Sequence, residues 1–567
     1  MNEKIYGIDL GTTNSCISLI EAGRPRVVPI DGDGIVPSVV SFDGSETLVG
    51  RRALNRYAAF PEESVRSVKR LMGGPDKIKA AGRTYDPEDI SAAILGYLRD
   101  EAQRIEGHEV RRVVVTVPAY FSDAQRRATI DAGERAGLKV ERIVNEPTAA
   151  ALFYDKLRVS REDGLDEDGA HWRRALVYDL GGGTFDVSIL RMGEIIEVLS
   201  STGDTRLGGD DFDERLLELM LMRIEEEGGP SLMGYRPAIA RLRTAAERAK
   251  IELSTRASAL IEEANIPTPD GTRCSLSMEI TREAFQALTA YLIDRTIDFI
   301  MKALDEADLR PGDIDRVLLV GGMTRMPAVS ERLAELFGDV SMPVVDPDRS
   351  VALGAAIQGG IISGEETDQI LLDVTAHTLS TAALSGDGLL CVPIIPRNTP
   401  IPATRSRMFY SMAQNQRTAT VEVYQGESGL PKENTLIGRT VLQLAKAEEH
   451  CPIVIEYAYD LNGIIRVTAE QKGYSRRTEV RMDSRNPAGE AMQEINEMAD
   501  DGADAAPTVI PVNFVTNRAR KKLEGMPHGE ERDAFEKLLA AYEEALLTES
   551  GEIDEIEDDL IEAMENR

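Results

Sequence analysis

The chain has 567 residues, too many for one hydrophobic core, so we expect about two to four domains. Its net charge of -32 argues against a general nucleic-acid or anionic-membrane binder, because phosphate groups would be repelled. With no apolar run near the roughly 18 residues of a membrane span, no signal-peptide pattern and four scattered cysteines, it is expected to be cytoplasmic with reduced thiols.

The first 366 residues alternate strand-like and helix-like patterns. The strand-like runs are short, rich in β-branched residues and bounded by polar or turn residues, as at 112–117, 174–178 and 316–320. Apolar residues at helical spacing lie between them, as at 122–136 and 240–253. This alternation predicts an α/β domain over residues 1–366.

The remainder of the chain changes character twice. Residues 367–374 enclose three apolar residues between acidic ones and are expected to link two domains. Residues 375–485 alternate strand-like pieces with turns, which predicts a β-sandwich. Residues 486–567 carry 22 Asp and Glu against 7 Lys and Arg and predict a short helical tail. We expect a first helix near 488–498, a break at 500–511 that contains Pro507 and Pro511, and then helices marked by Phe535, Leu538, Leu539, Tyr542, Leu546, Ile553, Ile556, Leu560 and Met564.

Two similar segments lie 170 residues apart. Residues 8–13 (Ile-Asp-Leu-Gly-Thr-Thr) and 178–184 (Tyr-Asp-Leu-Gly-Gly-Gly-Thr) each follow an apolar strand and precede another. Glycines let backbone amides approach phosphate oxygens, and threonine hydroxyls add donors. One such segment alone is as often a plain β-hairpin, and neither is a Walker loop. Two in one register predict a phosphate-binding cleft formed by Gly11, Thr12, Thr13, Asn14, Gly181, Gly182, Gly183 and Thr184.

The same repeat supplies carboxylates and is joined by two further elements. Asp9 and Asp179 end the strands and, with Asp186, can face hydrated magnesium. Gly321 and Gly322 permit a flat adenosine to lie on the backbone, with Arg325 stacking on the base. Glu247, Lys250 and Ser254 lie on one face of a predicted helix, and this polar face could bind a ribose and the edge of a base. Polar residues at such spacing more often form a face exposed to solvent.

At these positions the sequence resembles the 70-kilodalton heat-shock protein family, the DnaK class of chaperones, and within it the short, specialised bacterial members of the HscC type. The motifs that carry the resemblance are residues 7–15, 115–121, 145–151, 179–186, 203–209 and 321–325. The resemblance implies an actin-like ATPase domain of two ribonuclease-H-like lobes (1–366), a linker (367–374), a peptide-binding β-sandwich (375–485) and a short, interrupted helical lid (486–567).

The resemblance also implies which residues act on ATP. Lys69, which on sequence alone resembles any surface lysine, matches the lysine that positions the attacking water. Glu146 and Thr184 match residues that orient the water and the γ-phosphate, and Asp179 completes the catalytic set. Asp348 joins the residues expected to bind ATP or ADP. The carboxylates expected around hydrated Mg²⁺ and around K⁺ are Asp9, Asp179 and Asp186.

Further matches concern coupling and partners. Pro118 and Arg126 match a relay between nucleotide and linker, and Arg142 matches a contact for J-domain partners. Four residues match the linker that docks on the ATPase domain when ATP is bound: Ile370, Leu371, Leu372 and Asp373. Without the resemblance, the same residues could equally form an ordinary buried strand. Leu384 and Met412 match an arch over a bound extended apolar peptide. The groove residues, which could equally be core residues, are Phe409, Val421 and Ile464. A monomer that works with a J-domain co-chaperone, and with a nucleotide-exchange factor, is expected.

The sequence departs from the family pattern in four places. The stretch after Met72 is short, in a lobe that exchange factors touch. Residues 155–173 are long and acidic, end at Trp172 and are expected to form a surface loop. The Thr-Pro-Leu-Ser-Leu-Gly opening of the β-domain appears at 375–380 as Thr-Ala-His-Thr-Leu-Ser. The tail has no acidic Glu-Glu-Val-Asp terminus.

Two other functions are compatible with the twin hairpins. A small-molecule kinase of the sugar-kinase type would use both hairpins but would not need residues 375–485. A non-enzymatic actin-like scaffold would use the fold for assembly. Both are kept as alternatives to the chaperone.

Overall fold

The computed structural model describes most of the chain. It covers residues 4–159, 174–193, 195–343, 346–364, 370–385, 388–446, 451–474, 476–482 and 530–548, with positions 519, 522, 523, 556, 560 and 563. The chain divides into two compact units, Met1–Asn496 and Glu497–Arg567. Each is described by itself.

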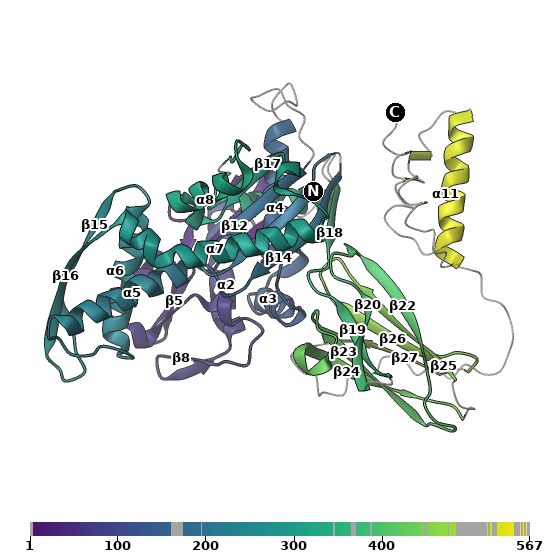
Figure 1. Ribbon diagram of the computed structural model, residues 1–567. Coiled ribbons are helices and arrows are strands. Elements are labelled where there is room, and N and C mark those ends of the chain that lie inside the picture. The colour runs from purple at the N-terminus through teal and green to yellow at the C-terminus, as the bar shows by residue number, and fades with distance from the viewer. Residues whose placement is uncertain are drawn as a thin grey trace. The chain divides into compact units, whose positions relative to one another are not determined.

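Two six-stranded sheets with the same core topology form the first part of the larger unit (Figure 1). In each, an antiparallel meander is extended by a parallel strand, through β1–β10 in one sheet and β12–β17 in the other. The first sheet consists of β11 (Lys139–Asn145), β10 (Arg112–Val117), β1 (Ile5–Leu10), β2 (Asn14–Glu21), β3 (Arg24–Val27) and β4 (Val36–Pro37). The second consists of β17 (Arg316–Val320), β12 (Arg174–Leu180), β13 (Phe185–Arg191), β14 (Ile195–Asp204), β18 (Ile370–Val374) and β21 (Pro400–Ile401). The repeat seen in the sequence is therefore a repeat of fold.

Helices cover these sheets, and their sequences explain where they lie. Helix α9 is apolar or small all round, with most of its residues buried, because it packs against α4 and against β1 and β2 of the first sheet. Ser122 caps α3 and shares a capping box with Gln125. The helices are α1 (Arg51–Tyr57), α2 (Pro87–Glu106), α3 (Asp123–Arg135), α4 (Glu146–Val159), α5 (Gly209–Glu226), α6 (Arg236–Leu253), α7 (Arg282–Glu306), α8 (Pro327–Phe337) and α9 (Ser350–Ser363).

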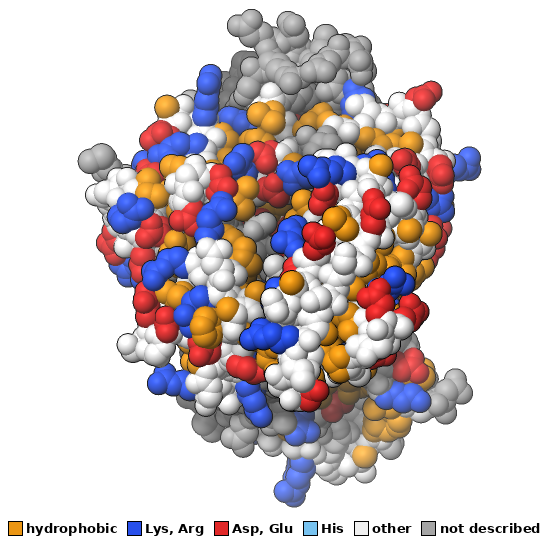
Figure 2. All heavy atoms as spheres, turned by 90° about the vertical axis from the view of Figure 1, so that its left-hand side faces the viewer, with side chains coloured by type: hydrophobic (Ala, Val, Ile, Leu, Met, Phe, Trp, Pro, Cys, Tyr) orange, Lys and Arg blue, Asp and Glu red, His pale blue; other side chains and the backbone are white. Residues whose placement is uncertain are grey.

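Small sheets complete this part: β5 (Val39–Asp43), β6 (Glu46–Val49) and β7 (Ser64–Arg66); β8 (Ile78–Ala80) and β9 (Arg83–Tyr85); and β15 (Ser258–Pro267) and β16 (Arg273–Thr281). Figure 2 shows acidic and basic side chains interspersed over the face that includes β15 and β16. The expected loop over residues 155–173 is partly wrong. Helix α4 continues to Val159, and its earlier residues Ala150, Ala151 and Leu152 are buried in the core.

Residues 379–481 form the predicted β-sandwich. One sheet has the order β20-β19-β23-β24 and the other β22-β25-β26-β27. Alternate residues face inward and form one core, as the alternating burial of β25 shows. The strands are β19 (Leu379–Ser385), β20 (Gly388–Ile395), β22 (Ala403–Tyr410), β23 (Thr418–Gln425), β24 (Thr435–Gln443), β25 (Pro452–Tyr459), β26 (Ile465–Gln471) and β27 (Arg476–Arg481).

The smaller unit contains α11 (Glu530–Thr548), where helical spacing predicted a helix. Phe535, Leu539 and Tyr542 form its buried side, with Leu560 in the same cluster. None of the helices in the described ranges is long and apolar enough to cross a membrane. Several expectations lie outside the described residues: the loop at 160–173 with Trp172, linker residues 367–369, the helix near 488–498, the break at 500–511, and Ile553 and Met564.

The packing of α9 on α4 predicts the effect of one methyl group. In Gly354→Ala the new Cβ would overlap the carbonyl oxygen of Ala149, so we expect the free energy of unfolding to fall by roughly 3 kcal/mol. Gly96 in α2 has open space around the same position. Gly96→Ala is the control and should stabilise the protein by roughly 0.5–1 kcal/mol. Chemical denaturation of both variants measures this, and equal effects would contradict the packing.

Candidate functional site

The two hairpins of the repeat meet turn to turn. A Cβ added to Gly182 would collide with the side chain of Thr13, and one added to Gly183 would lie 2.5 Å from Thr12. The amide of Gly181 donates to the carbonyl of Thr184 at 3.0 Å, which closes the second turn. Only glycine permits this approach. The two predicted phosphate-binding loops are therefore brought together.

Three aspartates of the repeat lie behind these turns. Asp179 and Asp186 are paired across β12 and β13, whereas the position across from Asp9 is Cys16. Thr116 donates to Asp9 at 3.1 Å, and the amide of Tyr120 donates to Asp186 at 3.0 Å.

These carboxylates carry more negative charge than the protein neutralises. Burial and then Glu146 raise the pKa of Asp9 and of Asp186 to about 7, and the same two causes raise the pKa of Asp179. Lys69 opposes the shift in all three. Within the described ranges no three acidic, histidine or cysteine side chains could hold a metal ion directly.

Lys69 and Glu146 form a buried ion pair beside the aspartates. Lys69 lies in a 3₁₀ turn (Val68–Leu71) that follows Ser67 in the left-handed region, at φ 54°. Glu146 is the first residue of α4, where the helix dipole favours a negative charge. Burial lowers the pKa of Lys69, but Glu146 and Asp9 outweigh it and raise the pKa overall. The residue pattern alone predicts an exposed Lys69, but its exposed fraction in the structure is 4%.

The polar face of α6 points inward rather than into solvent. Glu247 pairs with Arg66 at 2.9 Å, and Lys250 pairs with Asp213 at 2.9 Å. Ser254 follows the helix and donates to the carbonyl of Lys250 at 3.4 Å. The solvated-face explanation is therefore wrong for Glu247 and Lys250.

The glycine turn after β17 also lies near the second hairpin. Gly321 has a φ of 84°, and a Cβ there would overlap the carbonyl of Leu180. Arg325 pairs with Asp348 at 2.6 Å, so these two predicted nucleotide residues contact each other. Gly322 begins the intervening 3₁₀ turn.

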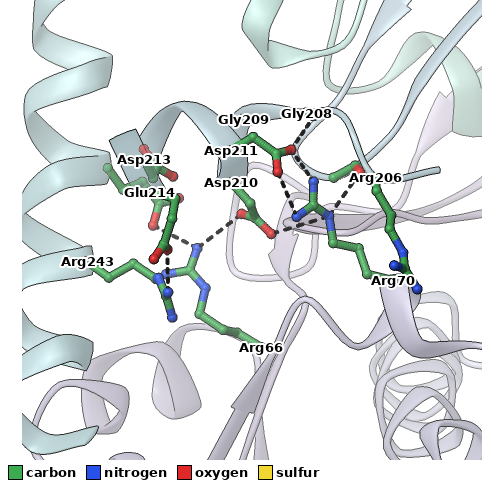
Figure 3. A network of polar contacts seen from close by, with 12 residues as sticks. Arg66, Arg70, Arg206, Gly208, Gly209, Asp210, Asp211, Asp213, Glu214 and Arg243 are labelled. Atoms are coloured by element: carbon green, nitrogen blue, oxygen red, sulfur yellow. Dashed lines mark hydrogen bonds and ion pairs between the residues drawn. The ribbon is translucent and has the colours of Figure 1, made fainter. Parts of the chain in front are cut away.

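Sequence reasoning missed a network of arginines and acidic residues that joins the two halves (Figure 3). Arg70 pairs with Asp211 at the start of α5 and donates to the carbonyl of Gly183 at 3.0 Å. Arg66 reaches Asp210 at 4.0 Å. The available signal was local: three cations within residues 66–70, and Asp210-Asp211 directly after two glycines. The partners are more than 100 residues apart, so sequence alone could not pair them.

Residues Ile370–Val374 of the predicted linker form a strand, β18, on the second sheet. β18 pairs in parallel with β14, which places Leu371 opposite Ile196 and Leu372 opposite Glu197. Leu371 packs against the core between the sheets. The backbone of Ile370 pairs with that of Ile195. Both sequence expectations, a buried strand and a docked linker, are compatible with this pairing.

Asp373 connects this strand to the ion pair. It accepts a hydrogen bond from the amide group of Asn145 at 2.8 Å, and Asn145 directly precedes Glu146. Arg126 donates to the side-chain oxygen of the same Asn145 at 2.7 Å and to the carbonyl of Ala119 at 3.0 Å, next to Pro118. One expected relay residue, Arg126, and the linker aspartate thus meet at one asparagine, while Pro118 adjoins the carbonyl that Arg126 also contacts.

The β-sandwich contacts the first part of the chain at several points. Arg397 pairs with Glu306 at 2.8 Å, and the Asn462 side chain accepts from the amide of Ile143 at 3.1 Å. His377 contacts Tyr120. Arg142 lies beside this region, and its pKa is lowered by burial although Asp373 acts to raise it.

The five expected peptide-binding residues divide by exposure. Leu384 and Met412 are exposed, at 58% and 60%, as residues of an arch would be. Val421 and Ile464 are buried, and Phe409 packs partly against the core of the sandwich. Val421 and Phe409 contribute to the core of the sandwich, and Ile464 is buried. The role of these three residues in a peptide groove stays a prediction.

Comparison with known proteins covers almost the whole chain. The family model described as "Hsp70 protein" matches residues 5–78 and 74–565. A relative named "Chaperone protein DnaK", from Ureaplasma urealyticum serovar 10, is 42% identical over 552 residues, which cover 95% of this chain and 90% of the relative.

The buried carboxylates predict an unusual pH dependence. Because the pKa of Asp186 is raised from 3.8 to about 7, the native state binds its proton more tightly than the unfolded state, and stability falls as pH rises between those values. We expect metal-free Asp186→Asn to be more stable than the parent at pH 8, by roughly 2–4 kcal/mol, with a flatter profile. Denaturant unfolding with a chelator measures this.

Asp270 supplies the control, because hydrogen bonds from Thr268 and Thr272 lower its pKa to about 2. Asp270→Asn should give no such gain. Parallel pH profiles for the parent and Asp186→Asn would contradict the assignment.

Proposed function

The chain belongs to the Hsp70 family and is an ATP-dependent molecular chaperone that hydrolyses ATP, and from this premise we propose how its own residues carry out that activity. Membership disfavours the sugar-kinase and scaffold alternatives. The proposed domains are an ATPase domain (1–366), a linker (367–374), a β-domain that binds peptide (375–485) and a helical lid (486–567). Reduced thiols suit a cytoplasmic location, and all four cysteines are free.

The buried Lys69–Glu146 pair is the observation that carries the catalytic proposal. Hydrolysis requires a water placed against the γ-phosphate, and phosphoryl transfer depends on positioning and charge neutralisation. Lys69 and Glu146 hold that water between a donor and an acceptor, and Thr184 orients the γ-phosphate. The amides of both hairpins bind the remaining phosphate oxygens.

The excess of buried carboxylates supports a role for cations. Asp9, Asp179 and Asp186 are the residues that would face a hydrated Mg²⁺ ion and K⁺ ions. Such ions supply neutralisation of the phosphate charge when ATP is bound. Their positive charge would also return the raised pKa values of Asp9 and Asp186 toward the ordinary range.

The adenosine part of ATP is proposed to lie between α6 and the glycine turn. Glu247 and Lys250 face inward from α6, where their pairs with Arg66 and Asp213 keep them oriented. Ser254 lies at the end of the same helix. On the opposite side the base would stack on Arg325, beside the turn that Gly321 and Gly322 begin and the Asp348 carboxylate that pairs with Arg325.

Peptide binding is proposed to be coupled to ATP through the linker. The hydrogen bond from Asn145 to Asp373 joins the residue next to Glu146 to the strand that leads into the β-domain. A docked β18 therefore favours one arrangement of the catalytic site, and peptide binding alters ATP hydrolysis in return. Extended apolar segments are the proposed clients, in a groove formed by Leu384, Phe409, Met412, Val421 and Ile464. A J-domain co-chaperone at Arg142, and an exchange factor, are the proposed partners of a monomer.

Removing the ammonium group tests the catalytic proposal. Lys69→Ala should keep ATP binding but lower the single-turnover hydrolysis rate by about 100-fold or more, because the water loses its positioning donor. Lys77, an exposed lysine paired with Asp86, provides the control Lys77→Ala, which should hydrolyse ATP normally. Quench-flow with radiolabelled ATP, with and without an extended apolar peptide, measures both. Parent-like hydrolysis by Lys69→Ala would refute the role.

A further inference from the structure

His377 stands at an unusual position for its chemistry. It falls in the stretch where the β-domain opening departs from the family pattern, between β18 and β19. Its Nε2 lies 3.2 Å from the carbonyl oxygen of Tyr120, and the two rings are 4.3 Å apart and tilted by 58°. Because a carbonyl oxygen only accepts, Nε2 carries the hydrogen. A neutral imidazole is sufficient for this bond.

Tyr120 connects His377 to the phosphate-binding hairpins. Its carbonyl faces the histidine of the β-domain, and its amide donates to Asp186 at 3.0 Å. One residue thus bonds at one end to the β-domain and at the other to a carboxylate of the proposed ATP site. Loss of the His377 contact would leave the carbonyl of Tyr120 without this hydrogen bond, while the amide of Tyr120 would still donate to Asp186.

The surroundings of His377 oppose a positive charge. Arg126, beside Tyr120, and Arg397 of the β-domain both face it and act to lower its pKa. Glu427 acts to raise the pKa, but its oxygens already accept hydrogen bonds from the amide and hydroxyl of Thr378, at 2.9 and 2.6 Å. Burial is the largest effect. Burial and the two arginines outweigh the hydrogen bond to Tyr120 and the charge of Glu427, which raise the pKa of His377, and lower it from 6.5 to about 4.

We infer that His377 is a proton-sensitive contact between the ATPase domain and the β-domain: the neutral side chain holds the docked state at Tyr120, and its protonation releases it. The inference rests on the proposed function, since it concerns the docked arrangement that couples ATP to peptide. It adds a residue of this chain to that coupling and makes the coupling respond to acid.

The direction of the pH effect on docking follows from the pKa of His377 in the docked state and in the released state. In the docked state the pKa of His377 is about 4, and a released, hydrated histidine has the ordinary value of 6.5. Docking is therefore fully favoured above 6.5 and weakens as pH falls toward 4, by about tenfold between pH 7.5 and pH 5.5. Asp373 acts in the opposite direction, because burial raises its pKa when docked and its protonation favours docking. A variant that changes His377 alone separates the two.

His377→Gln is that variant, since the glutamine amide can donate to the Tyr120 carbonyl but does not titrate. The experiment uses the full chain with saturating ATP and follows hydrogen exchange of the β18 amides, corrected for the intrinsic pH dependence of exchange. Between pH 7.5 and 5.5 we expect the ratio of the parent's protection factor to that of His377→Gln to fall about tenfold, because both proteins keep the opposing effect of Asp373. His108→Gln, which alters a histidine bonded to Tyr6, should behave like the parent.

The possible results separate the inference from the function on which it rests. Equal pH dependence in the parent and His377→Gln would overturn the role of His377 while leaving ATP-dependent docking intact. An absence of ATP-dependent protection in the parent at pH 7.5 would overturn docking itself, and the inference with it. Thermal unfolding of both variants verifies that they are folded, and His377→Ala, expected to dock weakly at every pH, provides a second test of the bond.

Discussion

The structure depends on a charge imbalance in one small volume. Asp9, Glu146, Asp179 and Asp186 lie around the ammonium of Lys69, and burial and mutual repulsion raise the pKa values of the three aspartates. Such an arrangement is unfavourable in the empty protein and becomes favourable when cations and phosphate groups enter together. Binding energy is thereby concentrated at the point where hydrolysis takes place. An ATPase built on this imbalance needs rigid backbone around it, which the twin hairpins and the buried helix α9 provide.

The same volume is linked to the rest of the chain by adjacent residues. Glu146 belongs to the ion pair with Lys69, while its neighbour Asn145 bonds to the linker through Asp373 and to Arg126. In the proposed coupling, a shift of the linker would act on the backbone that carries Glu146, without a long chain of contacts. Tyr120 offers a second, parallel connection, between Asp186 and His377. Both end at the face where the β-sandwich contacts the ATPase domain.

Much of this could be predicted because it is local. The strand periodicity of 112–117 and 316–320 matches β10 and β17 residue for residue, and the repeated Asp-Leu-Gly pattern identified both hairpins. Lys69 needed the family resemblance, since a lysine in a short polar stretch has no local sign of burial. The contacts of Arg66 and Arg70 with Glu247 and Asp211 join segments far apart in sequence, so only the fold brings them together. The predicted loop over residues 155–173 starts too early, because α4 continues to Val159 and the acidic composition of this stretch hid the end of the helix.

A double-mutant cycle on Asn145 and Asp373 tests whether the linker acts on hydrolysis through the hydrogen bond between these two residues. Single-turnover ATP hydrolysis is measured with and without a saturating apolar peptide for Asn145→Ala, Asp373→Ala and the double variant. The account predicts that each single change removes most of the peptide stimulation and that the double change removes no more, because both break one interaction. Independent, additive losses, or full stimulation in Asn145→Ala, would contradict it.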